Sequence, residues 1–220
     1  MIRAFPTKKG TGITIYGDYY DLTILHDVIH EIAMTIVAYS ESQCGKHQLL
    51  MNFAYEIRKA KEQSRKIEKF DIDGEQVTYY GAQIIWPDIL IFTNVMRQYA
   101  GYLALDKLAQ STLYLLEYSI EKAMLEYDVM GAKDLKNLIS TGLYTDQKYI
   151  FQIYQTVHSD FISQPTGKRR FRKLNDLLRA YISPFSDLNK DVISDLEKSA
   201  KEFNCRVLDI EVGTFPDIVW

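Results

Sequence analysis

Apolar residues recur at intervals of three and four along most of the chain, which is the spacing of one face of an α-helix. The first such run covers 19–39, directly after Gly17 and Asp18, and a second covers 46–69 and is almost entirely charged in its second half. A third run begins at Pro87, a residue suited to the first turn of a helix. Further runs occupy 108–127, 150–161, 171–181 and 188–203. The pattern therefore predicts six or seven helices.

A smaller set of segments alternates apolar and polar residues or is bounded by turn residues, as β-strands are. Residues 2–5 and 12–17 predict an N-terminal hairpin with a turn-rich connection. The dipeptide Asp73-Gly74 lies between two such arms and is a favoured two-residue hairpin turn, which predicts a central hairpin. Residues 206–212 also alternate, so we expect a C-terminal strand that returns to the N-terminal hairpin.

Together these elements predict an α+β fold that is predominantly helical. A small, mostly antiparallel sheet, built from the two hairpins and the C-terminal strand, would pack against the six or seven helices. The length of 220 residues and a hydrophobic content of 47% suit a single compact domain covering 1–220. The one linker-like segment, 163–167, leaves open a helical subdomain over 146–203.

Composition narrows the cellular setting and the partners. The formal net charge of −3 is too small to indicate a charged partner for the molecule as a whole. Cys44 and Cys205 are fewer cysteines than a disulfide-stabilised secreted chain of this size would usually carry. No apolar run has the length of a signal peptide or a membrane helix. We therefore expect a cytoplasmic protein without a membrane partner.

The first candidate site is the pair His26 and His30. Residues four apart lie one above the other on a helix, and this spacing lets two imidazoles bind one zinc or iron ion. The run His-Asp-Val-Ile-His resembles the zinc-protease pattern His-Glu-x-x-His, but Asp27 is one methylene shorter than the glutamate that acts as general base. A third ligand would have to come through the fold, from His47, His158 or a carboxylate. The alternative is that both histidines flank the apolar stripe of the helix, and no resident cofactor is predicted.

The second candidate is a basic cluster around one aromatic residue, at the start of a predicted helix. Its members are Lys168, Arg169, Arg170, Arg172 and Lys173. Positive charge is unfavourable at a helix N-terminus because of the helix dipole. A bound phosphate or nucleic acid would offset that cost, and so would an acidic neighbour within the fold or in a partner. The acidic overall charge works against nucleic acid.

A third pattern, Trp86-Pro87-Asp88, resembles the acid loop of tyrosine phosphatases. That family also needs a cysteine followed six positions later by arginine, whereas here Cys44 and Cys205 are followed by leucine and glutamate. Pro87 is therefore better interpreted as a helix start. Asp88 also falls within the most apolar window of the chain, 84–95.

No complete catalytic set assembles from these patterns. The leading hypothesis is a non-enzymatic binding or interaction module, whose partner is an unidentified protein or a second copy of this chain. One alternative is a metal-dependent hydrolase that uses His26 and His30. The other is a protein that binds nucleic acid or phosphate through residues 168–173.

Overall fold

Four strands form one antiparallel sheet in the computed structural model, which describes residues 1–36, 40–210, 212 and 217–220. The strand order is β1-β2-β4-β3, and the bounds are β1 Arg3–Pro6, β2 Gly12–Gly17, β3 Lys66–Ile72 and β4 Glu75–Ile85. Asp73 and Gly74 join β3 to β4 with φ values of 55° and 85°, the left-handed geometry that a tight hairpin turn needs. Both predicted hairpins are confirmed.

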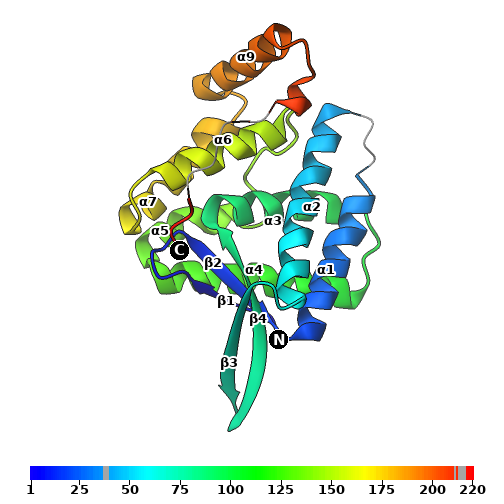
Figure 1. The fold of residues 1–220 in the computed structure, drawn as a ribbon, viewed down its shortest axis with the longest axis vertical. Helices are drawn as coiled ribbons and strands as arrows, with labels where there is room; N and C mark the ends of the chain where they lie inside the picture. The colour runs from blue at the N-terminus through cyan, green and yellow to red at the C-terminus, as the bar shows by residue number, and fades with distance from the viewer. Residues whose placement is uncertain (37–39, 211, 213–216) are drawn as a thin grey trace.

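The two faces of the sheet differ in what they contact. On one face, Ile13 lies opposite Ile84 and Ile15 lies opposite Ala82, and all four side chains are buried in the hydrophobic core. On the other face, four aromatic rings from the four strands pack against one another. They are Phe5, Tyr16, Phe70 and Tyr79. Figure 1 shows the helices gathered beside β1 and β2, while the β3–β4 hairpin projects away from them.

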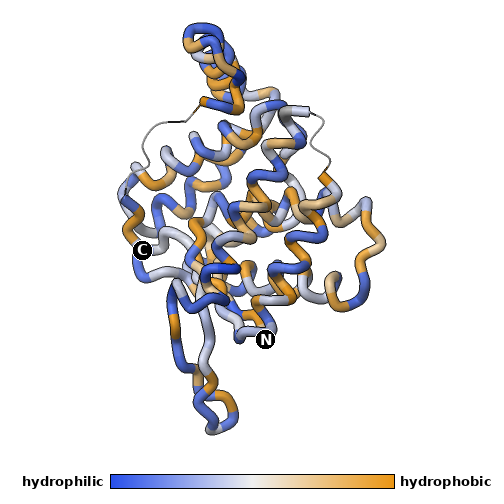
Figure 2. The backbone as a smooth tube through the Cα atoms, turned by 45° about the vertical axis from the view of Figure 1, so that its right-hand side comes forward, coloured by the Kyte–Doolittle hydropathy of each residue, from blue (hydrophilic) through white to orange (hydrophobic). Residues whose placement is uncertain are grey.

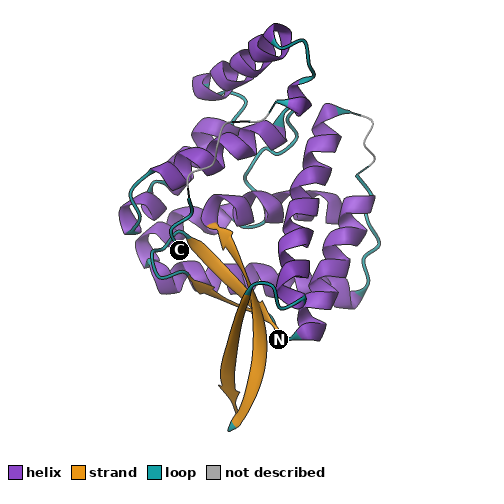
Figure 3. Ribbon diagram, viewed as in Figure 1, coloured by secondary structure: helices purple, strands orange, loops and turns teal. Residues whose placement is uncertain are grey.

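Nine α-helices are present among the described residues, more than the predicted six or seven. Their bounds are α1 Tyr19–Met34, α2 Glu41–Lys61, α3 Trp86–Ala100, α4 Lys107–Tyr127, α5 Val129–Leu135, α6 Ile150–Ser163, α7 Lys168–Arg172, α8 Leu174–Ile182 and α9 Asp187–Glu202. The difference arises because α5 was not predicted and because the run 171–181 divides into α7 and α8. Figure 3 shows how far helix exceeds strand. The predicted class, a predominantly helical α+β fold, is confirmed.

Local sequence explains where two of these helices begin. Before α1, the Asp18 carboxylate accepts a hydrogen bond from the Asp21 amide at 2.8 Å, and the Asp21 carboxylate accepts one from the Asp18 amide at 3.1 Å. This reciprocal capping box satisfies two amides that the helix itself leaves unpaired. Pro87 stands in the first turn of α3, as predicted. Every residue from Trp86 to Met96 is buried, so α3 lies within the core.

Hydrophobic packing connects distant parts of the chain. One cluster of buried residues runs from Ile2 to Ile182 and includes side chains from the sheet and from α1 to α6. A second, smaller cluster lies under α9 and contains Tyr149, Leu196 and Val207. Figure 2 shows apolar and polar residues alternating along the backbone of the packed helices. Of the helices that the structure describes, none combines the length and the apolar character required to cross a bilayer.

Two predicted elements are wrong. The second helix ends at Lys61 rather than at residue 69, and 66–72 form β3, because pairing with β4 overrides the helical spacing of this charged segment. The expected strand over 206–212 is absent where the structure describes it, since Val207–Asp209 form a short 3-10 helix. The Arg206 guanidinium bonds both oxygens of the Asp209 carboxylate, at 2.9 and 2.8 Å, and closes this turn. Glu211 lies outside the described residues.

Candidate functional site

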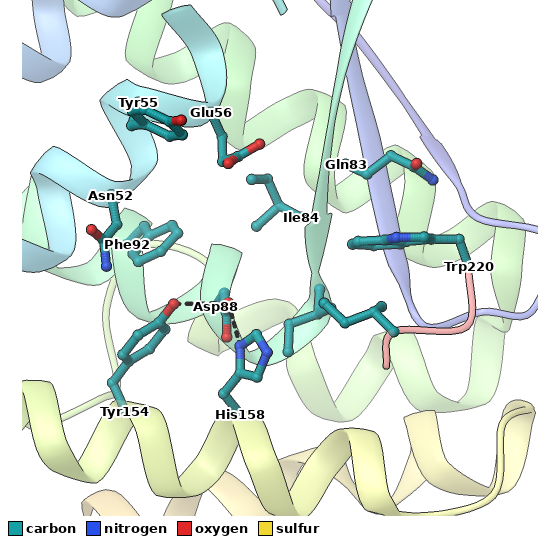
Figure 4. Close-up of a pocket in the computed structure, with 12 residues that line it drawn as sticks. Asn52, Tyr55, Glu56, Gln83, Ile84, Asp88, Phe92, Tyr154, His158 and Trp220 are labelled. Atoms are coloured by element: carbon teal, nitrogen blue, oxygen red, sulfur yellow. Dashed lines mark hydrogen bonds and ion pairs between the residues drawn. The ribbon is translucent and has the colours of Figure 1, made fainter. Parts of the chain in front are cut away.

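A cleft of about 330 Å³ opens between α2, α3, α6, the end of β4 and the last residues of the chain. Its walls combine aromatic side chains with several polar groups. The aromatic members are Tyr55, Phe92, Tyr154 and Trp220, and the polar members are Asn52, Glu56, Gln83, Asp88 and His158. Figure 4 shows the Asp88 carboxylate at the centre, with Tyr154 and His158 on α6 directed toward it. An apolar hollow with a few convergent polar groups is the usual form of a small-molecule site.

Asp88 is the most deeply placed charged group of the cleft. It stands in the first turn of α3 and is 6% exposed. Its Oδ2 accepts a hydrogen bond from the Tyr154 hydroxyl at 3.1 Å and lies 2.8 Å from Nδ1 of His158. Tyr154 and His158 are four residues apart on α6 and therefore present their side chains from one face. The second carboxylate oxygen, Oδ1, is buried and has no hydrogen-bond partner among the described residues.

Burial and mutual contact shift the pKa values of Asp88, Tyr154 and His158. Burial raises the pKa of Asp88, and the charge and hydrogen bond of His158 oppose that rise. Burial lowers the pKa of His158, but the charge and hydrogen bond of Asp88 outweigh it, so the net shift is upward. The pKa of Tyr154 is raised well above its ordinary value by burial and by the Asp88 carboxylate. The charge and hydrogen bond of each group thus shift the pKa of the other.

A second carboxylate, Glu56 on α2, faces the same cleft. The Arg65 guanidinium holds it with two hydrogen bonds, from Nε to Oε2 at 2.8 Å and from Nη2 to Oε1 at 3.0 Å. The Glu56 charge also contributes to the raised pKa of Tyr154. The cleft thus contains two carboxylates, and the one nearer the surface is paired with an arginine.

The wall at Trp220 depends on a residue of the predicted basic cluster. The Thr11 hydroxyl donates to the carbonyl oxygen of Val219, and Nη2 of Arg170 donates to that Thr11 hydroxyl at 2.8 Å. Nη1 of Arg170 donates at 3.1 Å to the carbonyl oxygens at the end of α6, those of Phe161 and Gln164. Arg170 is 3% exposed, so it joins the N-terminal hairpin, α6 and the cleft wall from inside the fold.

The rest of the basic cluster lies on the surface around α7. Arg172 makes two hydrogen bonds to the Asp128 carboxylate, at 2.7 and 2.8 Å, and Nζ of Lys168 lies 3.9 Å from the same group. These contacts lower the pKa of Asp128 to about 2, the Arg172 hydrogen bond contributing most. Asp128 is therefore an acidic neighbour within the fold of the kind expected to offset this charge. Arg169 and Lys173 are exposed, and anion binding by the cluster stays a prediction.

The predicted histidine pair does come together on α1. The rings of His26 and His30 are 4.4 Å apart between centroids, and Nδ1 of His26 lies 3.3 Å from the exposed Asp27 carboxylate. Burial lowers the pKa of His30, and the neighbouring His26 adds to that effect. Within the part of the chain that the structure describes, no three His, Cys, Asp or Glu side chains are grouped so as to hold a metal ion. A metal centre at this pair stays a prediction.

The central residues of the cleft were not selected as a site from sequence. Asp88 gave the clearest signal, as a charged residue inside the most apolar window, but the phosphatase-like motif around it was incomplete. His158 was named as one of several third ligands for the α1 pair, whereas the structure places its Nδ1 against Asp88 instead. Tyr154 falls on the apolar stripe of its helix, and nothing in the sequence marks its hydroxyl. A buried acid whose partners lie 66 and 70 residues further along the chain can be found only once the fold is known.

Comparisons with known proteins give a family and no characterised relative. No curated protein and no solved structure matches the chain significantly. One family model matches residues 2–220, which is nearly the whole chain. The protein therefore belongs to the family described as Domain of unknown function (DUF6904).

Proposed function

We propose that this protein is a non-enzymatic binding protein for a small organic ligand, and that the cleft around Asp88 is its binding site. The observation that carries the proposal is that Asp88 lines the cleft and that its buried Oδ1 lacks a hydrogen-bond partner among the described residues. A buried acceptor left unpaired costs about 1–3 kcal/mol, and more when it is charged. A ligand with an N–H or O–H donor at this position would recover that cost. The proposal includes a cytoplasmic location, which the low cysteine content supports.

The chemistry of the walls narrows the ligand to an aromatic or aliphatic amine. Phe92 and Tyr154 offer flat apolar surfaces beside the Asp88 carboxylate, and aromatic faces also attract cations. A second carboxylate, Glu56, also lines the cleft, where it is paired with Arg65. The volume of about 330 Å³ lies at the small end of the range for ligand pockets. A single-ring amine fits these features, whereas a carboxylate or phosphate ligand would meet like charge.

Calorimetric titration with three probes of one shape tests the proposal. Benzylamine, benzyl alcohol and benzoate share a ring and differ in the group that would meet Asp88. We expect affinity to fall in that order. Asp88→Asn should weaken benzylamine binding by roughly tenfold or more, because it removes a charged acceptor. The matched control is Asp27→Asn, which alters an exposed aspartate on α1.

Two results would contradict the proposal. One is benzoate binding as tightly as benzylamine. The other is equal benzylamine affinity in the wild type and in Asp88→Asn, provided that circular dichroism shows both to be folded. Loss of binding in Asp27→Asn as well would indicate that the titration reports general surface charge rather than the cleft.

A further inference from the structure

Strand β3 forms one edge of the sheet, and its outer side is exposed. Among the strands that the structure describes, in the order β1-β2-β4-β3, it pairs with β4 alone. Residues 66–69 and Asp71 are exposed, and Ile67 keeps 51% of its surface. The hairpin also projects from the helices (Figure 1), so another chain can approach this edge. An edge strand presents a row of N–H and C=O groups that can pair with a further strand.

We propose that this edge binds a second copy of the same chain, so that two β3 strands pair antiparallel across a two-fold axis. In such a pair, opposed residues point to the same face of the sheet. A two-fold axis must therefore place one residue opposite its own copy, since any other arrangement would direct the two copies of one side chain to different faces. The register is fixed by which residue lies on the axis.

Charge selects one of these registers. An axis at Lys66, Glu68, Lys69 or Asp71 places two like charges directly opposite each other, and an axis at Ile72 places Asp71 opposite Asp73. Like charges in opposed positions destabilise a sheet, and opposite charges stabilise it. An axis at Ile67 sets Lys66 opposite Glu68 but also Arg65 opposite Lys69.

An axis at Phe70 gives no like-charge pair. It sets Lys69 opposite Asp71 twice, once on each side of the axis, with the two Phe70 side chains facing each other at the centre. This register is therefore the one that the charge pattern of β3 favours.

A two-fold axis at Phe70 would also extend the aromatic cluster that covers one face of the sheet. Phe70 stands on the edge strand, and its ring contacts all three other rings of the cluster, with its centroid 5.2 Å from Tyr79, 5.3 Å from Tyr16 and 5.8 Å from Phe5. It is half-buried within one chain. Two Phe70 rings at the axis would join both clusters into one aromatic layer and cover the remaining exposed edge of each ring. The axis chosen by charge is thus also the axis that sets the one aromatic residue of β3 against its own copy.

Sedimentation equilibrium with two charge-reversed variants tests this register. In a dimer of Lys69→Asp, two negative side chains face each other at both positions where Lys69 meets Asp71. In a dimer of Asp71→Lys, two positive side chains face each other at the same positions. Each variant alone should dimerise at least tenfold more weakly than the wild type. An equimolar mixture should recover the dimer, because each chain then meets the opposite charge at both positions. Lys198→Asp, which reverses an exposed charge on α9, is the matched control and should dimerise like the wild type.

A wild type that stays monomeric up to roughly millimolar concentration, the weak end of specific association, would overturn the proposal. So would a mixture that remains monomeric while both variants are folded.

Asp71 also accepts a hydrogen bond from the Gly74 amide at 3.0 Å, so Asp71→Lys could disturb the turn. Phe70→Cys avoids that residue. Mild oxidation should link two chains through this cysteine, as peptide mass mapping would show, whereas Ile67→Cys should not cross-link, and the reverse result would exclude the axis at Phe70.

Discussion

Two histidine–aspartate contacts in this molecule share their chemistry and differ in their surroundings. On α1, His26 lies 3.3 Å from Asp27, its neighbour in sequence, and the Asp27 side chain is 71% exposed. In the cleft, His158 lies 2.8 Å from Asp88, and the two side chains are 12% and 8% exposed. Exposed ion pairs contribute little, because water and ions already solvate them. Breaking a buried pair leaves an uncompensated group inside the protein. Both sites contain a histidine and an aspartate, and they differ in how deeply these side chains are buried.

The largest expected difference between the two pairs appears when the aspartate of each is replaced by alanine. Asp88→Ala should lower the free energy of unfolding by about 3–5 kcal/mol, because it leaves His158 buried without this partner and leaves a cavity in α3. Asp27→Ala should change it by less than about 0.5 kcal/mol. Urea denaturation of both variants measures the difference. Equal losses would show that the cleft pair is no more important to the fold than the surface pair.

A smaller effect should follow from the tyrosine that shares the buried carboxylate. Tyr154→Phe removes the hydrogen bond from the Tyr154 hydroxyl to Oδ2 of Asp88 and keeps the ring. Its free energy of unfolding should fall by about 1–2 kcal/mol, the contribution of a buried hydrogen bond to a charged or polar acceptor. The control is Tyr118→Phe on α4, a residue that is 61% exposed, and its loss of unfolding free energy should be near zero. A stable Tyr154→Phe would mean that Asp88 is held by His158 alone.

The two histidine sites should also respond to pH in opposite directions. The pKa of His158 is raised in the folded protein, so its stabilising contribution is complete below the unfolded pKa of about 6.5 and is lost as pH rises through the folded pKa. The pKa of His30 is lowered by burial and by His26, so its contribution is present above about pH 6.5 and is lost as pH falls through the folded pKa.

Urea midpoints measured from about pH 5.5 to 8.5 would separate these contributions. His158→Gln should remove part of the loss of stability on the alkaline side, and His30→Gln should remove part of the loss on the acid side. Because His30 is less buried than His158, its effect should be the smaller. If His158→Gln left the alkaline side unchanged, Asp88 and His158 would not share a titration.

The elements of this fold that depend on neighbouring residues are predictable from sequence, whereas those that depend on distant contacts are not. Asp73-Gly74, Pro87 and Asp18, the residue before α1, act through neighbouring residues, and the elements they predict are present. The charged segment after Lys61 and the alternating segment 206–212 were assigned by local pattern too, but their structure depends on partners. The first pairs with β4, and the second packs Val207 in a cluster with Tyr149 and Leu196.

The candidate sites divide in the same way. Helical spacing was sufficient to bring His26 beside His30, because both lie on one helix. Contacts that join separate elements could not be obtained from spacing, and the meeting of Asp88 with α6 is such a contact. Arg170 is a further example, since one residue of an apparently solvated basic run is buried against Thr11 and Phe161. At Arg170 the sequence shows a basic residue, but it does not show which residues the guanidinium contacts.

The smallest expected effect concerns metal at the α1 pair. His26 and His30 supply two of the four ligands that zinc usually takes in proteins, and the remaining positions would be filled by water. We expect excess zinc to raise the free energy of unfolding by less than about 1 kcal/mol, as weak binding to the folded state implies. Replacing both histidines by alanine should abolish that increase, whereas Cys205→Ser, which removes an exposed thiol elsewhere, should not. Near-stoichiometric zinc or iron in dialysed protein, lost in the double variant, would instead support the metal-dependent hydrolase and move the chemistry of this protein from the cleft to α1.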